Sequence, residues 1–142
     1  MTDAPAQDPN QPAAAGGPPM IRVLAQYVKD LSFENPGLFA AQQGASAPEI
    51  ELGIDVKVEP GPPAEHIFSV ELRLSARAKR QDAVVFICEL VYAGVVQLLD
   101  AGREGVEPML LIECPRLLFP FARRVIADVT REGGHPPLMI DP

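Results

Sequence analysis

Histidine, cysteine and aromatic residues are scarce in this chain, which limits the kinds of site that it can build. The 142 residues include two histidines, two cysteines and no tryptophan. Cys88 and Cys114 stand far apart, without Cys-x-x-Cys spacing and without a histidine pair nearby, so the sequence predicts no metal site. Two thiols of this kind are typical of buried small residues in a reducing cytosol.

Long apolar runs and a secretory signal are also missing. No stretch of about 18 residues is apolar throughout, so the sequence predicts no membrane-spanning segment. The N-terminus has neither the basic nor the apolar region of a signal peptide. The first 19 residues hold five of the 16 prolines and no large apolar residue after Met1. We therefore expect a disordered tail at residues 1–19 and a single domain at residues 20–142.

Positive charge is in deficit, with 12 lysines and arginines against 19 aspartates and glutamates. The tail contributes only Asp3 and Asp8 to this count, so the predicted domain is itself acidic. Nucleic-acid binding needs a basic face, which this composition argues against. The balance permits a basic protein partner, although an acidic surface that serves solubility is the commoner explanation.

Catalytic motifs are absent too. The sequence has no nucleophile elbow, phosphate-binding glycine loop, metalloprotease helix or calcium-binding loop. Strand alternation places Glu49, Glu51 and Glu59 on a solvent face, which argues against general acid–base catalysis. Cys88 lies among apolar residues, where burial should raise the pKa of its thiol. An enzyme would need a convergent polar cluster that the sequence does not show, so we expect no catalytic residue and no cofactor.

Four segments have the pattern of β-strands: residues 20–34, 49–59, 66–79 and 83–99. Apolar and charged residues alternate strictly in the second and third, which predicts strands with one wet face. A polar turn at Arg80–Asp82 predicts a hairpin between the third and fourth. The fourth is apolar on both faces and carries a lone charge, Glu89. Because one helix can cover only one face, this strand favours an oligomer.

A long amphipathic helix is predicted in the C-terminal part of the chain. The apolar residues recur at helical spacing and form the expected core stripe: Leu118, Phe121, Ala122, Val125, Ile126 and Val129. Pro115 suits a first helical position, but Pro120 does not suit a helix interior, so the pattern predicts that the regular helix begins near Leu118. Gly133 and Gly134 give a C-terminal stop.

Specific strings in these elements resemble the SecB family of bacterial protein-export chaperones. They are Tyr-Val-Lys-Asp-Leu-Ser-Phe-Glu-Asn-Pro from residue 27, Phe-Ile-Cys-Glu-Leu from residue 86, and Cys-Pro-Arg-Leu-Leu-Phe-Pro-Phe-Ala-Arg from residue 114. The final segment, Gly-Gly-His-Pro-Pro-Leu-Met-Ile-Asp-Pro from residue 133, resembles the family's exit from the long helix. The resemblance covers nearly everything from Met20 onward.

The resemblance implies an α+β fold, a four-stranded antiparallel sheet with one long helix, which assembles as a dimer of dimers. It also implies a non-enzymatic cytoplasmic holdase of bacteria that binds unfolded secretory preproteins without ATP and delivers them to the SecA motor. The family normally continues into a second, C-terminal helix; this sequence ends at Pro142, so either it is truncated before that helix or the helix is absent. The alternative is a β-rich oligomeric adaptor that does not hold clients.

Site residues follow from the same resemblance. The acidic strings imply SecA-binding positions at Asp30, Glu34, Ile87 and Glu89, and any zinc belongs to SecA. A client-binding groove is expected near seven apolar residues: Leu38, Phe39, Val95, Val96, Leu98, Leu138 and Ile140. The alternative is that about half of these seven are ordinary core residues.

Overall fold

The computed structural model describes residues 20–39, 47–99 and 102–142, and the predicted tail at residues 1–19 lies outside this part of the chain. The described elements are four strands and a helical segment in three consecutive parts, with a short 3-10 turn between the second and third strands. Their bounds are β1 Met20–Glu34, β2 Glu49–Pro60, η1 Pro63–Glu65, β3 Ile67–Arg80, β4 Ala83–Leu99, α2 Arg103–Pro108, η2 Met109–Glu113 and α3 Cys114–Glu132.

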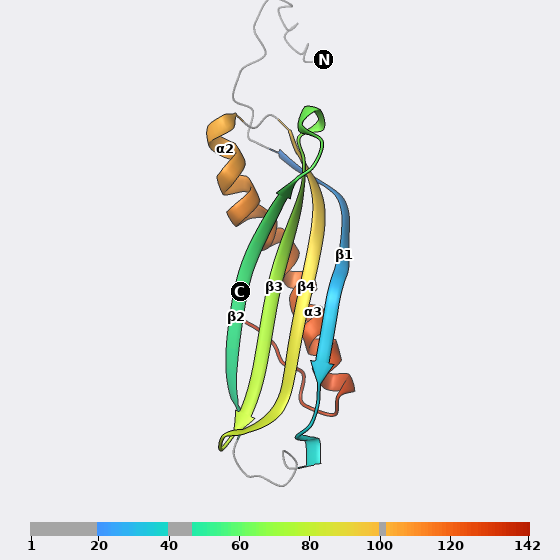
Figure 1. Cartoon of the computed structure of the whole chain (residues 1–142), viewed down its shortest axis with the longest axis vertical. Helices are drawn as coiled ribbons and strands as arrows, with labels where there is room; N and C mark the ends of the chain where they lie inside the picture. Colours follow the sequence, from blue (N-terminus) through green and yellow to red (C-terminus); the bar gives the residue numbers. More distant parts are fainter. Residues whose placement is uncertain (1–19, 40–46, 100–101) are drawn as a thin grey trace, which may run out of the picture.

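The strands form one antiparallel sheet in the order β1-β4-β3-β2, which confirms the predicted four-stranded sheet (Figure 1). The turn between β3 and β4 consists of Gln81 and Asp82, both with positive φ, at 48° and 67°. Two residues in this conformation match the right-handed twist of the strands that they join. The hairpin predicted from the polar turn is therefore present.

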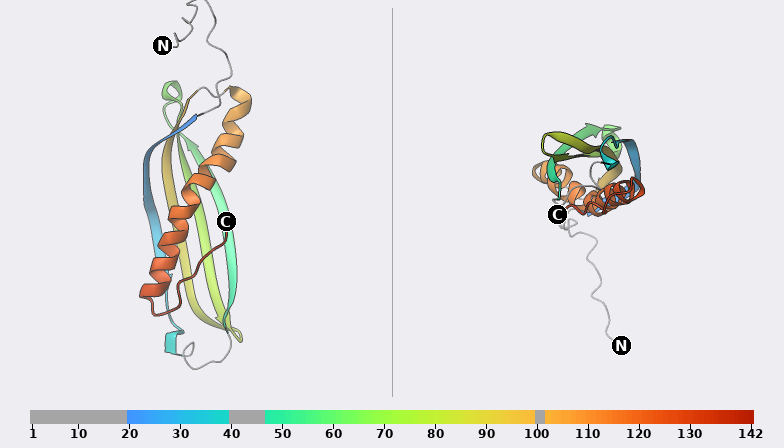
Figure 2. Two further views of the ribbon diagram at one scale, coloured as in Figure 1. Left: turned by 180° about the vertical axis from the view of Figure 1, so that it is seen from behind. Right: turned by 90° about the horizontal axis from the view of Figure 1, so that it is seen from below.

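The helical segment and the C-terminal tail cover the same face of the sheet, which we call the helix-side face (Figure 2). Alternate residues of β3 and β4 line this face and pair across the strands, as Leu72 does with Tyr92 and Leu74 with Leu90. Leu118 and Ile126 of α3 are fully buried in the same core. No described element covers the opposite face, which we call the outer face; Arg73 and Glu89 lie on it.

The prediction that the helix begins near Leu118 is wrong. Helix α3 begins at Cys114 and continues without a break from the π-helical turn η2. Pro115 has no N–H to donate, and its ring would crowd the carbonyl four residues earlier in an ordinary α-helix. The wider π-helical turn directly before it relieves this conflict. Pro120, on which the prediction rested, lies inside α3, so this helix contains a proline that the sequence rule placed outside the helix interior.

The predicted apolar stripe of the helix is only partly core. Leu118, Ala122 and Ile126 are buried, whereas Phe121 is 47% exposed. The Phe121 ring stacks on Tyr92, with 6.4 Å between centroids and 5° between planes. Phe121 therefore lies at the margin of the core.

Candidate partner-docking surface

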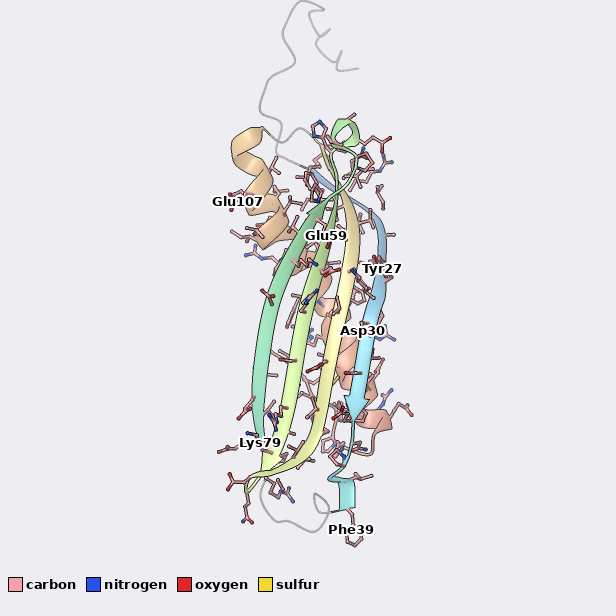
Figure 3. The ribbon with its side chains drawn as sticks, in the orientation of Figure 1. Tyr27, Asp30, Phe39, Glu59, Lys79 and Glu107 are labelled. Carbon is pink, nitrogen blue, oxygen red and sulfur yellow. The ribbon has the colours of Figure 1, made fainter. Side chains whose placement is uncertain are left out.

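The four predicted SecA-binding residues lie together on the outer face, at the junction of β1 and β4. Glu34 pairs with Ile87 across the two strands, and Asp30 pairs with Val91. Glu89 lies between those two positions of β4, opposite Ser32. The three acidic side chains are exposed and Ile87 is half-buried. Figure 3 marks Asp30 on β1, between Tyr27 and the C-terminal end of the strand.

Two bulges in β1 determine which way these acidic side chains point. The pairing of β1 with β4 shifts between Val23 and Ala25, and again between Val28 and Asp30. Each extra residue reverses the alternation of side chains between the two faces. Because the second shift cancels the first, Asp30 points to the outer face. The sequence showed only moderate alternation in this segment, and it gave no sign of where the reversals occur.

A shallow hollow of about 430 Å³ lies on the outer face and spans all four strands. Asp30, Asp55 and Glu89 are its carboxylates, and Arg73 is its only lining cation. Its other lining residues are Gly53, Ile54, Leu74, Ser75, Leu90 and Val91. The hollow extends the acidic surface onto β2 and β3, beyond the positions that the resemblance implied. Strand alternation predicted that Asp55 faces water, but only the register shows that it lies opposite Arg73.

Gly53 keeps this hollow open. A Cβ atom at this position would lie 2.5 Å from Oγ of Ser75, its partner on β3. A larger residue would therefore both displace Ser75 and fill the hollow.

A buried carboxylate lies beneath the outer face beside the hollow. Glu71 is fully buried, and it accepts a hydrogen bond from Nζ of Lys29 and another from a guanidinium nitrogen of Arg73 at 3.2 Å. The hydrogen bond from Lys29 is the main reason that the pKa of Glu71 lies below its ordinary value, and burial opposes this shift. The sequence predicted the outward face for Glu71 but not its burial, because its cover comes from β1.

The seven predicted groove residues are divided between core and surface. Val96, Leu98 and Ile140 belong to the core of the single chain, so the alternative stated above applies to these three. Val95 is half-buried on the outer face, opposite Ala25 and Ser69. The remaining three lie near the helix-side face or the end of β1: Leu38 and Leu138 are half-buried and Phe39 is 76% exposed. A groove role for these four stays a prediction.

Exposed apolar residues also occur on the face of β2 that alternation predicted to be covered, and in the C-terminal tail. Leu52 and Ile54 of β2 point to the helix-side face, yet they are 50% and 59% exposed. Met139 of the tail is 60% exposed. Figure 2 shows the tail running between α3 and β2 over this part of the sheet. We call Leu52 and Ile54 the apolar strip. Alternation assigned the two strand residues to the right face, but it could not show that the helix leaves this edge uncovered.

Hydrogen bonds hold the C-terminal tail against the helix and the end of β1. Oγ1 of Thr130 accepts a hydrogen bond from the backbone N–H of Leu138 at 2.9 Å. Nδ2 of Asn35 donates to the carbonyl of Gly133 at 2.8 Å. The ring of His135 packs on Phe86 with 4.9 Å between centroids, and burial lowers the pKa of this histidine.

Both cysteine thiols are in surroundings that disfavour the reactive thiolate. Cys88 and Cys114 are both buried, and burial raises the pKa of each to about 11. For Cys88 this confirms the direction that the sequence predicted. Among the described residues, no group of three or more histidine, cysteine, aspartate or glutamate side chains could hold a metal ion. None of the described helices is both long and apolar enough to cross a membrane.

Comparison with known proteins agrees with the acidic strings and with the fold. The family model described as "Preprotein translocase subunit SecB" matches residues 14–142. "Protein-export protein SecB" of Maricaulis maris is 57% identical over 145 residues, covering 100% of this chain and 81% of that protein. The protein of the same name from Hyphomonas neptunium is 56% identical over 143 residues, covering 100% and 84%. The chain therefore belongs to the SecB family of protein-export chaperones.

A solved structure shares the fold at low sequence identity. It is a SecB-like chaperone of Mycobacterium tuberculosis in complex with a ChAD peptide from an antitoxin. The two chains superimpose with a TM-score of 0.72 at 17% identity, covering 86% of this chain and 90% of the other. This similarity supports the four-stranded sheet with its long helix as the fold of the described chain.

Proposed function

We propose that this protein is an ATP-independent holdase that binds unfolded secretory preproteins in the bacterial cytoplasm and delivers them to SecA. The observation that carries the proposal is the separation of two surfaces on one sheet. The acidic residues occupy the outer face, and the exposed apolar strip lies on the helix-side face. A protein with this arrangement can hold an apolar chain and contact a basic protein at the same time.

Client holding needs exposed apolar area beside backbone N–H and C=O groups that can form hydrogen bonds with the client. Burial of apolar area stabilises a bound chain by roughly 25 cal/mol per Å² without consuming nucleotide. Leu52 and Ile54 lie on β2, which is an edge strand of the sheet within the described chain. An extended client segment can add main-chain hydrogen bonds at such an edge. The SecB-like chaperone of Mycobacterium tuberculosis was solved with a peptide bound, and we extend peptide binding to this chain as part of the proposal.

Delivery to SecA uses the acidic residues of the outer face. Asp30, Glu34 and Glu89 are exposed on two neighbouring strands, with half-buried Ile87 among them. This arrangement offers charge complementarity to a basic segment and a small apolar contact beside Glu34. Charge pairs between exposed groups raise association rates and are sensitive to salt.

Assembly as a dimer of dimers accounts for further exposed apolar residues. Along β1, an edge strand, six large apolar side chains are 39% to 57% exposed: Met20, Val23, Leu24, Tyr27, Val28 and Leu31. Leu117 and Phe121 are each 47% exposed on one side of α3, four residues apart. Exposed apolar residues on an edge strand and on the long helix are typical of subunit contacts.

Aggregation of a denatured precursor tests the holdase activity. We expect the purified protein to suppress aggregation equally with and without ATP, and the double variant Leu52→Gln/Ile54→Gln to lose much of this effect. The matched control is Glu49→Gln/Glu59→Gln on the other face of the same strand, which should act as wild type. If the wild type does not suppress aggregation, the alternative of an adaptor without client holding is favoured.

A further inference from the structure

Two of the cations on the face that the proposed function assigns to a basic partner, Lys29 and Arg73, are held by one buried carboxylate. The side chain of Glu71 is 1% exposed, whereas those of Lys29 and Arg73 are each 47% exposed above it. We propose that Glu71 is a positioning residue that keeps Lys29 and Arg73 away from the carboxylates of the hollow, so that a cation of the partner can reach them. This inference rests on the proposed docking of SecA at this face.

The cations have other carboxylates within reach. Lys29 precedes Asp30 in the sequence, and Arg73 lies opposite Asp55 in the register of β2 and β3. Directly opposite side chains of neighbouring strands have Cβ atoms about 5 Å apart, close enough for an ion pair. Yet neither cation pairs with these acids. Within the described residues, Asp30, Asp55 and Glu89 have no ion-pair partner.

The bulge in β1 explains how Lys29 reaches Glu71. As the extra residue of the bulge, Lys29 can project over the outer face rather than towards the core. Its side chain then spans β4 to reach β3. Ala93 is the β4 residue that pairs with both Tyr27 and Glu71, and its small side chain is fully buried. A larger residue at this position would block the bridge.

Burial explains why Glu71 attracts both cations more strongly than the exposed acids do. A buried carboxylate has lost its water, so it needs charged hydrogen-bond partners. Coulombic attraction is also stronger where water is excluded than at the exposed Asp30 or Asp55. Without the negative charge of Glu71, Arg73 lies opposite Asp55 of the hollow, whereas Lys29 is left between Asp30 of the hollow and Glu59, which lies outside it. Because Glu71 is itself inaccessible, it affects a docked partner through these two cations and not by contact.

Binding of purified SecA, measured by titration calorimetry at low and high salt, tests the inference. We expect Glu71→Gln to weaken binding about five-fold at low salt, since each freed cation neutralises part of the acidic surface. The double variant Glu71→Gln/Arg73→Gln restores the local charge and should recover most of the loss. The matched control is Glu51→Gln, an exposed acid of the outer face paired with Lys79 at 3.3 Å, which should bind as wild type.

Each outcome decides a different claim. If wild type binds SecA and Glu89→Lys does not, but Glu71→Gln binds as wild type, the positioning role is wrong and the docking surface stands. If Glu71→Gln binds SecA weakly and the double variant binds it equally weakly, Glu71 does not act through Arg73. That result also overturns the inference. If wild type itself does not bind, the docking proposal fails and this inference fails with it.

A folding defect in Glu71→Gln would not leave the question open. Circular dichroism and oligomer mass identify such a defect. In that case the SecA affinity of the single variant Arg73→Gln tests the inference. Because Arg73 is already held by Glu71, its loss should leave SecA affinity within two-fold of wild type or increase it. A clear loss of affinity would show that Arg73 contributes to docking directly, contrary to the inference.

Discussion

Nε2 of His135 and Oδ1 of Asn35 form a hydrogen bond of 2.6 Å between residues that are 100 positions apart in the sequence. The bond joins the end of β1 to the exit from α3, where the tail begins. Asn35 also donates to the carbonyl of Gly133, so one side chain holds both sides of the turn. This junction orients the tail towards the apolar strip.

The junction should make stability depend on pH. Burial lowers the pKa of His135 in the folded state below its ordinary value of 6.5. The unfolded chain therefore binds this proton more readily, and the contribution of His135 to stability is fully present above that value. It should be lost as the pH falls from about 6.5 towards the lower folded pKa. Urea unfolding at pH 7.5 and 5.5 measures the loss, and His135→Gln should reduce the difference between the two midpoints. An unchanged pH dependence in this variant would contradict the assignment.

Thr130 should control how firmly the tail is held. Its hydroxyl accepts from the N–H of Leu138, so Thr130→Val leaves that donor without its partner and should cost about 1 kcal/mol. Hydrogen exchange should accelerate at residues 136–142 more than in β3 and β4. Thr130→Ser retains the hydroxyl and is the control. Equal protection of the tail in the valine variant would mean that the bond contributes little.

Charge reversal should separate SecA binding from client holding. Asp30→Lys or Glu89→Lys should weaken SecA binding at low salt by about ten-fold, with a smaller difference at high salt, because exposed charges are screened. Suppression of client aggregation should survive. Glu107→Lys, on the exposed surface of α2, makes the same change of charge away from the outer face (Figure 3). Unchanged SecA affinity in both variants would refute the assigned docking residues.

Substitutions should also distinguish client surface from core. Ile54→Gln alters a residue that is 59% exposed, so it should change the free energy of unfolding by less than about 0.5 kcal/mol while weakening client binding. Val96→Ala removes buried methyl groups and should cost about 2 kcal/mol. At a temperature where both variants are folded, Val96→Ala should bind an unfolded client as wild type does. A competition assay with one labelled client compares the two. If Val96→Ala weakens client binding and Ile54→Gln does not, the groove lies at Val96, as the sequence predicted.

Much of the fold could be predicted because strand and helix periods are local properties. Strict alternation in residues 49–59 and 66–79 placed β2 and β3 within one residue of their observed bounds. The polar turn before Ala83 located the hairpin for the same reason. The start of the helix could not be predicted, because Pro120 lies within α3, where the local preference of proline argues against a helix.

The candidate site was predictable only in part. The resemblance indicated Asp30, Glu34 and Glu89, and the structure places them on one face. It did not indicate Asp55 or Gly53, which join the surface only because β2 pairs with β3 in one register. Nor could periodicity distinguish core from groove among apolar residues, since Val96 and Ile54 both lie on the helix-side face.

Local sequence patterns were enough to show which residues alternate, where the chain turns and that the surface is acidic, because each of these depends on composition or on neighbours a few positions away. Contacts between distant segments were needed to show that Glu71 is buried beneath Lys29, that Asn35 bonds to His135 and that Ile54 stays exposed. Each of these depends on which strand or helix lies beside it. Burial and pairing are properties of segments brought together from distant parts of the chain, and local patterns do not contain them.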